Sequence, residues 1–138
     1  MSTDLTGISA EVADWQREKV THFWMPNRKL LKSIRDYERY NQRKSIGSGL
    51  FKRFAVLRHR FWSVVTSSDI PLNSCLGGGL LIPHPNGIVI HPSSKIGVNC
   101  LIHQQVTIGV KRGDAGAPNI GGHVDIGAGA KIIGNITI

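Results

Sequence analysis

Isoleucines spaced six residues apart constrain the fold of this chain more than any other feature of the sequence. From residue 90 to the end, an isoleucine stands at every sixth position but one: Ile90, Ile96, Ile102, Ile108, Ile120, Ile126, Ile132 and Ile138. Asp114 takes the remaining place. A helix repeats every 3.6 residues and a strand every two, so neither explains a step of six. The step is typical of a parallel β-helix, in which each hexapeptide is one short strand and a corner.

The repeat predicts which side chains face inward. Three hexapeptides make a coil of about eighteen residues. Two inward columns are therefore expected, namely Ile90, Ile108 and Ile126 in one and Ile102, Ile120 and Ile138 in the other. Residues four places after an isoleucine are mostly small and are also expected inside: Ser94, Cys100, Val106, Val124, Ala130 and Ile136. Four glycines directly follow repeat isoleucines, where the backbone is expected to bend or to be approached closely: Gly97, Gly109, Gly121 and Gly127. A β-sandwich is disfavoured, because its strands alternate with a period of two.

Two irregularities interrupt the repeat. Ile70, Leu76 and Ile82 are also six apart, but eight residues separate Ile82 from Ile90. The segment 83–87 must hold the two extra residues, and its two prolines and Asn-Gly pair predict a rigid corner with His84 at the rim. The second irregularity, 109–119, is polar and rich in glycine, so it is predicted to project as a loop that carries Lys111 and Arg112 outward.

The first half of the chain has helical patterns. Helices are expected over 9–24, with Ser9 as N-cap, over 27–40, and over 50–65, whereas residues 1–8 are expected to be frayed. The third helix has an apolar stripe, which is predicted to cap the open first coil: Leu50, Phe54, Leu57 and Phe61. We therefore expect two parts, an α-helical segment over 1–68 and a β-helix over 69–138.

The net charge of +8 is concentrated in the first half. Residues 1–68 carry 13 of the 17 Lys and Arg and 6 of the 9 Asp and Glu, a net charge of +7. Solvated helix faces and an anionic partner both explain this excess. Trp15, Trp24 and Trp62 near these cations suit either an anionic membrane surface or packing against the coil cap. Nucleic acid is not an expected partner.

The remaining composition indicates a cytoplasmic protein. No apolar run approaches the roughly 20 residues of a membrane span, and the N-terminus has no signal-peptide core. The two cysteines, Cys75 and Cys100, indicate neither a disulfide framework nor a metal site. The chain ends on the first residue of a new hexapeptide, whereas a solenoid needs a terminal cap, so the β-helix is expected to be C-terminally incomplete.

From Asp69 onward the chain resembles the serine acetyltransferase family of hexapeptide-repeat acyltransferases. The resemblance rests on Asp69-Ile70-Pro71, on the His84 corner with Gly87-Ile88-Val89-Ile90, and on two later blocks. These blocks are Gln104-Gln105-Val106-Thr107-Ile108-Gly109 and Ile126-Gly127-Ala128-Gly129-Ala130-Lys131-Ile132-Ile133-Gly134-Asn135. Hexapeptides alone are unspecific, but the corner together with both blocks is specific.

The resemblance implies a left-handed coil, a homotrimer with active sites between neighbouring prisms, and acetyl-CoA as co-substrate with no permanently bound cofactor. It implies that His84 is the general base for an acceptor hydroxyl and that Asp69 orients its imidazole. Such a pair is chemically sound, because a carboxylate on the second nitrogen fixes the tautomer and stabilises the imidazolium. Gly109 and Ala128 match positions that contact pantetheine. Lys131, Lys111 and Arg112 would meet CoA phosphates.

The chain departs from the serine-specific pattern at three positions. Pro83 replaces an aspartate before the histidine, and Gly116 and Ala117 replace an arginine and a second histidine in the projecting loop. These replacements leave two acceptors open, L-serine and a sugar hydroxyl in surface polysaccharide synthesis.

Two functions other than acetyl transfer are also open for this chain. One is a non-catalytic basic module at an anionic membrane surface, which the basic helices suggest. The other is a zinc-binding β-helix like the carbonic anhydrases of this fold, with His91, His103 and His123 as ligands. Their spacing lacks the close histidine pair of that family, so we expect no metal.

Overall fold

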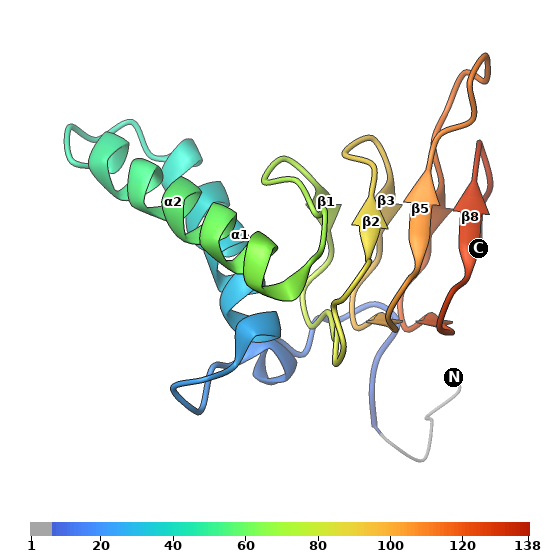
Figure 1. Cartoon of the computed structure of the whole chain (residues 1–138), viewed down its shortest axis with the longest axis horizontal. Coiled ribbons are helices and arrows are strands. Elements are labelled where there is room, and N and C mark those ends of the chain that lie inside the picture. The colour runs from blue at the N-terminus through green and yellow to red at the C-terminus, as the bar shows by residue number, and fades with distance from the viewer. Residues whose placement is uncertain (1–6) are drawn as a thin grey trace.

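The computed structural model describes residues 7–138 and shows a helical hairpin at one end of a coil of short parallel strands (Figure 1). The sequence predicts a frayed end over residues 1–8, and residues 1–6 of that range lie outside the described part of the chain. The helical elements are η1 (Trp15–Glu18), α1 (Pro26–Gln42) and α2 (Ser48–Thr66). The strands are β1 (Cys75–Leu76), β2 (Val89–Ile90), β3 (Lys95–Ile96), β4 (Leu101–Ile102), β5 (Thr107–Gly109), β6 (Asn119–Ile120), β7 (Asp125–Ile126) and β8 (Lys131–Ile133).

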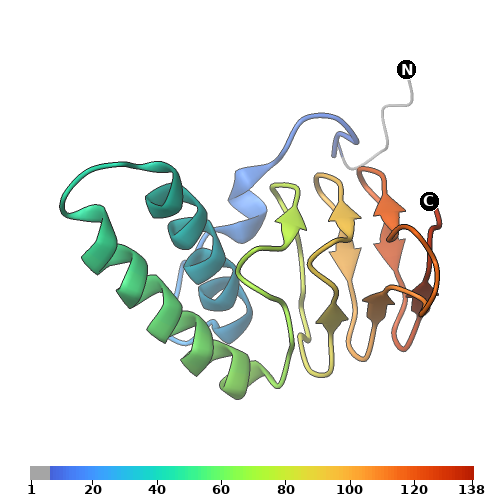
Figure 2. The same ribbon diagram turned by 90° about the horizontal axis from the view of Figure 1, so that it is seen from above.

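The strands wind around three faces (Figure 2). The sheets have the orders β1-β3-β6, β2-β5-β8 and β4-β7, and all of their pairings are parallel. Consecutive strands β3, β4 and β5 therefore lie in three different sheets, and β6, β7 and β8 return to the same three. The predicted three-sided parallel coil is thus present.

The six-residue repeat identifies the core of this coil. The repeat isoleucines from Ile90 to Ile132 are all at most 9% exposed, whereas Ile138 is 49% exposed. Each short strand places the residue before its isoleucine outward, because neighbouring side chains of a strand point to opposite faces. The hydrophobic core is therefore a stack of isoleucines along the coil axis.

The predicted columns are partly wrong. Ile108 stacks on Ile90 as expected, but its next partner is Ile132 and not Ile126. Ile102 pairs with Ile126 and not with Ile120. The reason is the loop between β5 and β6, which removes one whole hexapeptide from the coil. Where a column crosses the loop, its paired residues are consequently twenty-four positions apart in the sequence and not eighteen.

The glycines after the repeat isoleucines allow successive coils to approach closely. A Cβ atom on Gly97 would collide with the backbone of Gly121, and one on Gly77 would collide with Gly97. The expected close approach is thus present at Gly97 and, less tightly, at Gly121, where a Cβ would lie 3.2 Å from the carbonyl oxygen of Ile138. Gly109 and Gly127 have room for a Cβ.

Helix α1 closes the first coil. Leu30, Leu31 and Ile34 are at most 1% exposed and belong to the same core as the isoleucines. Helix α2 lies on the outer side of α1 and meets the coil near its C-terminal end, where a ring nitrogen of His59 lies 2.7 Å from the carbonyl oxygen of Ile70 (Figure 2). It packs through Ala55 and Trp62.

The predicted role of the apolar stripe of α2 is wrong. Its four residues are 55–62% exposed and do not cap the coil: Leu50, Phe54, Leu57 and Phe61. The place predicted for them is taken by α1, so α2 turns a different face inward. A helical stripe shows that one face is apolar, but it does not show what covers that face.

The expected helix over 9–24 is also wrong, since only η1 is helical there. Asn99 of the coil binds the backbone of this segment: its Oδ1 accepts from the amide of Asp14 at 2.7 Å, and its Nδ2 donates to the carbonyls of Ser9 and Val12 at 2.7 and 2.8 Å. These contacts satisfy backbone groups that a helix would have paired internally. The segment therefore lies extended along the coil.

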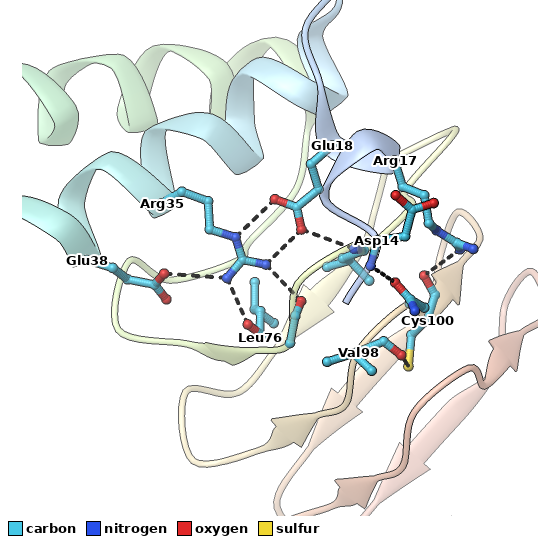
Figure 3. A network of polar contacts seen from close by, with 11 residues as sticks. Asp14, Arg17, Glu18, Arg35, Glu38, Leu76, Val98 and Cys100 are labelled. Atoms are coloured by element: carbon cyan, nitrogen blue, oxygen red, sulfur yellow. Dashed lines mark hydrogen bonds and ion pairs between the residues drawn. The ribbon is translucent and has the colours of Figure 1, made fainter. Parts of the chain in front are cut away.

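A buried ion pair joins η1, α1 and the first coil (Figure 3). Arg35 donates to both carboxylate oxygens of Glu18, at 3.0 and 2.8 Å, and to the carbonyls of Leu76 and Gly77, each at 2.8 Å. Glu18 also accepts from the amide of Leu80 at 3.1 Å. Burial disfavours the charged guanidinium, but Glu18 outweighs this effect, so the pKa of Arg35 lies above its usual value.

Candidate active site

The corner 83–87 is built as a rigid projection, with His84 exposed on it. Gly87 has a φ of +70° and its amide donates to the carbonyl of Ser67 at 2.8 Å, while the amide of Ile88 donates to Pro85 at 3.1 Å. These two bonds fix the base of the corner. His84 is therefore held at the rim, away from the isoleucine core, as the sequence predicts.

Gln105 supports the same corner from the next coil. Its Nε2 donates to Oδ1 of Asn86 at 3.1 Å, and its side chain covers Gly87 so closely that a Cβ there would collide with it. Gln105 itself has a φ of +60°. In the sequence, Gln105 stands out only as part of a motif and has no predicted role. The isolated sequence gives no signal that would pair residues 86 and 105, because their contact depends on coil stacking.

Asp69 is the first residue of the coil that pairs with a later strand. Its amide donates to Ile88 at 2.8 Å and its carbonyl accepts from Ile90 at 2.9 Å, so it lies beside the residues that follow the His84 corner. Its side chain is exposed. Across residues 7–138 no hydrogen bond joins the Asp69 carboxylate to the His84 imidazole. The coil thus brings the two segments together without closing a pair.

The sheet β2-β5-β8 carries two of the residues assigned to CoA. Gly109 ends β5 and pairs with Ile133, and Lys131 begins β8 and pairs with Thr107. Nζ of Lys131 donates to the carbonyl of Gln105 at 2.6 Å and to Oγ1 of Thr107 at 3.2 Å. Its ammonium is therefore held against the sheet, next to the turn from which Gln105 supports the His84 corner.

Ala128 lies in the exposed turn that leads into β8. The amide of Gly129 in this turn donates to the carbonyl of Gln104 at 2.9 Å. The structure therefore brings Ala128 close to the Gln104-Gln105 corner of the preceding coil. Side chains are small along this turn, which leaves its backbone accessible to an extended ligand.

The segment between β5 and β6 projects from the coil, as predicted (Figure 1). Lys111 and Arg112 are exposed on it. The loop folds back over the end of β8, because a Cβ on Gly116 would come within 2.7 Å of the Asn135 side chain and one on Gly134 within 3.1 Å of the Asp114 carboxylate. Both cations therefore lie near the end of β8, although neither makes an ion pair among the described residues.

Cys100 is not suited to be a nucleophile. It is fully buried, burial raises the pKa of its thiol, and Sγ donates to the carbonyl of Gly121 at 3.2 Å. Thiolates and not thiols attack thioesters. Cys75 is exposed on β1, on a different sheet from Lys131 and Gly109.

Within residues 7–138, no three His, Cys, Asp or Glu residues gather as a metal site. Nδ1 of His91 accepts from the amide of Ser93 at 3.2 Å, and His123 lies at a turn with a φ of +56°. His103 is half-buried after β4. In the same part of the chain, neither α1 nor α2 has the length and hydropathy needed to cross a bilayer.

Comparison with known proteins connects this geometry to one family. No family model matches the chain. The serine acetyltransferase of Staphylococcus xylosus is 36% identical over 104 residues, which are 74% of this chain and 45% of that protein. The serine acetyltransferase of Synechococcus elongatus is 39% identical over 77 residues, which are 54% of this chain and 32% of that protein.

Solved structures agree with the sequence matches. Serine acetyltransferase isoform 3 of Entamoeba histolytica, in complex with cysteine, has a TM-score of 0.66 at 30% identity and covers 83% of this chain. The Brucella abortus serine acetyltransferase in complex with coenzyme A has the same TM-score and identity over the same share. This chain is related to the serine acetyltransferases, which are hexapeptide-repeat acyltransferases. The chain covers 40% of the Entamoeba histolytica protein and 44% of the Brucella abortus protein, which is less than half of either.

Proposed function

We propose that this chain is an acyltransferase that moves the acetyl group of acetyl-CoA to a hydroxyl group. The observation that carries the proposal is the match to a serine acetyltransferase crystallised with coenzyme A, with a TM-score of 0.66 and 30% identity over 83% of this chain. The chain spans 32–45% of the curated relatives it matches. The activity of a whole relative is therefore assigned here as a proposal.

In the proposed reaction, His84 removes the proton of the acceptor hydroxyl as the oxygen attacks the thioester carbonyl, and CoA leaves as the thiol. Its exposed position on a rigid corner supports this role, because a general base must reach substrate without moving. Asp69 is proposed to bind the other imidazole nitrogen once substrate orders the rim. Direct transfer requires no acyl-enzyme, which agrees with the buried thiol of Cys100.

Coenzyme A is proposed to lie along the sheet β2-β5-β8. Gly109 and Ala128 would leave room for the pantetheine arm against the backbone. Lys131 would contact the ligand from the same sheet, and Lys111 and Arg112 would pair with phosphates from the projecting loop, since cations bind phosphate oxygens through charge-assisted hydrogen bonds. These five residues come from β5, the loop, the turn before β8 and β8 itself.

The assembly and location are proposed with the function. The family resemblance supports a left-handed coil and a homotrimer in which the active site lies between neighbouring prisms. Such an arrangement would let a neighbouring subunit complete the rim around His84. We also propose a cytoplasmic location, where acetyl-CoA is available.

L-serine is the acceptor that the relatives favour. A structure of the Neisseria gonorrhoeae serine acetyltransferase in complex with serine has a TM-score of 0.64 to this chain. A saccharide acceptor has no comparable support. Pro83, Gly116 and Ala117 differ from the serine-specific pattern, so we propose that serine is bound more weakly here than in the relatives.

The test is release of free thiol from acetyl-CoA by the purified chain, with L-serine or a panel of saccharides as acceptor. Thiol release that depends on L-serine, with O-acetylserine as product, is expected. Thiol release that occurs with a saccharide but not with L-serine would overturn L-serine as the acceptor and would still support acetyl transfer from acetyl-CoA. No release with any acceptor, from protein that binds CoA in calorimetry, would overturn the function.

A further inference from the structure

The outward face of α2 is apolar along its whole length. Six of its side chains are 38–79% exposed on one side of the helix: Leu50, Phe54, Leu57, Phe61, Val64 and Val65. We call these six residues the α2 stripe. Contiguous apolar surface of this kind marks a site of interaction and not ordinary solvent-exposed surface. Helix α1 lies on the opposite side, so no described part of the chain covers the stripe (Figure 2).

Aromatic side chains extend the stripe at one end. Phe61 packs edge-on against Trp62, with ring centroids 4.8 Å apart, and Trp62 packs against Trp24 at 5.6 Å. Trp24 is 63% exposed and its neighbour Phe23 is 85% exposed. Tryptophan and phenylalanine favour the boundary between water and lipid. Of the two roles left open for the tryptophans, packing against the coil fits Trp62, which belongs to the hydrophobic core, whereas Trp24 is largely exposed.

Cations border the apolar surface. Arg53 and Arg60 stand seven residues apart on one flank of α2 and line, with Lys52, a shallow hollow of about 540 Å³ beside Leu57. Lys29 lies over the ring of Phe23, 4.6 Å from its centroid. An apolar centre with a cationic border is the pattern of helices that lie in the headgroup region of a bilayer.

The positive charge of the helical hairpin, α1 and α2, favours a negatively charged partner. Residues 26–66 hold eleven Lys and Arg against two acidic residues, a net charge of +9. Both acids are paired within the hairpin: Asp36 with Lys32 and Arg58, and Glu38 with Arg35. Helix α2 itself carries four Lys and Arg and no acidic residue, so its own charge favours an anionic surface.

Two other partners fit less well. A second copy would bring together two α2 helices that each carry four cations and no acidic residue, and like charges across an interface oppose association. A nucleic acid binds mainly through its phosphates, which need cations, and the apolar α2 stripe offers them none. An anionic bilayer satisfies both features, since acyl chains accept the stripe and phosphates accept the arginines.

We propose that α2 docks this protein on an anionic phospholipid membrane, with the α2 stripe inserted at the acyl boundary and Arg53 and Arg60 on lipid phosphates. The proposal does not depend on the acetyltransferase activity. It concerns the helical end of the molecule, opposite β8 (Figure 1). The His84 corner lies beside the C-terminal end of α2, since Gly87 donates to Ser67, whereas the residues proposed to bind CoA lie farther along the coil on β5, its loop and β8.

The test is co-sedimentation of the full chain with vesicles of phosphatidylcholine, with and without phosphatidylglycerol, at low and high salt. We expect binding that requires phosphatidylglycerol and weakens with salt. Leu57→Gln should weaken this binding about tenfold, because the apolar insertion is lost. Arg53→Gln should weaken this binding about fivefold, because each Lys or Arg near an anionic leaflet contributes a binding free energy of that size.

Matched controls separate these effects from general ones. Val12→Gln makes the same kind of change at a residue that is 71% exposed outside α2, and Lys95→Gln removes an exposed cation from β3. Both should bind vesicles like the parent chain. Circular dichroism should show unchanged folding for Leu57→Gln, since Leu57 is 62% exposed.

Three results would overturn the proposal. The first is absence of binding to anionic vesicles. The second is binding that Arg53→Gln weakens while Leu57→Gln does not, since this would exclude insertion of the stripe. The third is lipid-free self-association that Leu57→Gln abolishes, because a second copy would then cover the stripe.

Discussion

The coil and the helical hairpin bury apolar side chains by different rules. In the coil, every repeat isoleucine from Ile90 to Ile132 lies inside, because the strand geometry places each one on the axis. In the hairpin, Leu30 of α1 is fully buried while Leu57 of α2 is 62% exposed, although both belong to apolar helical stripes. A solenoid repeat therefore predicts burial by itself, whereas a helix stripe predicts it only once its neighbour is known.

The ion pair that joins the two regions gives the largest expected effect. Arg35→Ala removes the partner of the buried Glu18 carboxylate and two bonds to coil carbonyls. Removing one member of a buried pair costs about 3–5 kcal/mol. We expect a loss of unfolding free energy of that size in urea titration. Arg39→Ala, at an exposed position of the same helix, should change it by less than about 0.5 kcal/mol.

A loss below about 1 kcal/mol for Arg35→Ala would contradict this expectation. It would show that the Arg35–Glu18 ion pair contributes little to holding the hairpin on the coil.

One pair of identical substitutions measures the difference between the helices. Leu30→Ala empties a fully buried position and should lower the unfolding free energy by about 2–5 kcal/mol. Leu57→Ala should change it by less than about 0.5 kcal/mol, because its side chain is already exposed. Equal losses for the two variants would contradict the placement of α1 between α2 and the coil.

The smallest expected effect concerns the contact between the helices and depends on pH. Burial of the Asp36 carboxyl disfavours its charge, but hydrogen bonds from Arg58 and Lys32 outweigh this, so its pKa lies below its usual value. Asp36 therefore stabilises the fold above the unfolded-state pKa of about 3.9, and this contribution is lost as pH falls through the lower folded pKa.

Asp36→Asn should remove that acid-dependent part of the stability, which we expect to be at most about 1 kcal/mol because Arg58 and Lys32 are 40% and 54% exposed. Urea titrations between pH 7 and pH 3 measure it. Parent and variant curves that stay parallel over this range would contradict the assignment.

Much of the coil was predictable from the sequence. The step of six located the inward isoleucines, the extra residues before Ile90 located the His84 corner, and Asp114 marked the projecting loop. The column partners after the loop were not predictable. A loop that removes one whole hexapeptide leaves the spacing of six intact, so the sequence does not reveal which coil each isoleucine joins.

The helical half was less predictable, because long-range polar contacts decide it. Asn99 binds the backbone of 9–14 across the coil, so a segment with a helical pattern lies extended. Arg35 is one of several cations along α1, and nothing in the sequence marks it as the one that pairs with Glu18 from another element. At the candidate site, the sequence predicted roles for His84 and Asp69, but it gave no indication of the support from Gln105.

The most direct test of the account is the turnover of acetyl-CoA by His84→Ala beside a matched histidine variant. The account predicts that His84→Ala slows thiol release with L-serine by about 10²–10⁴-fold while CoA binding in calorimetry is retained, because one acid-base group is lost. His91→Ala, whose ring only accepts a local backbone amide, should retain the parent rate. A parent-like rate for His84→Ala would contradict the account.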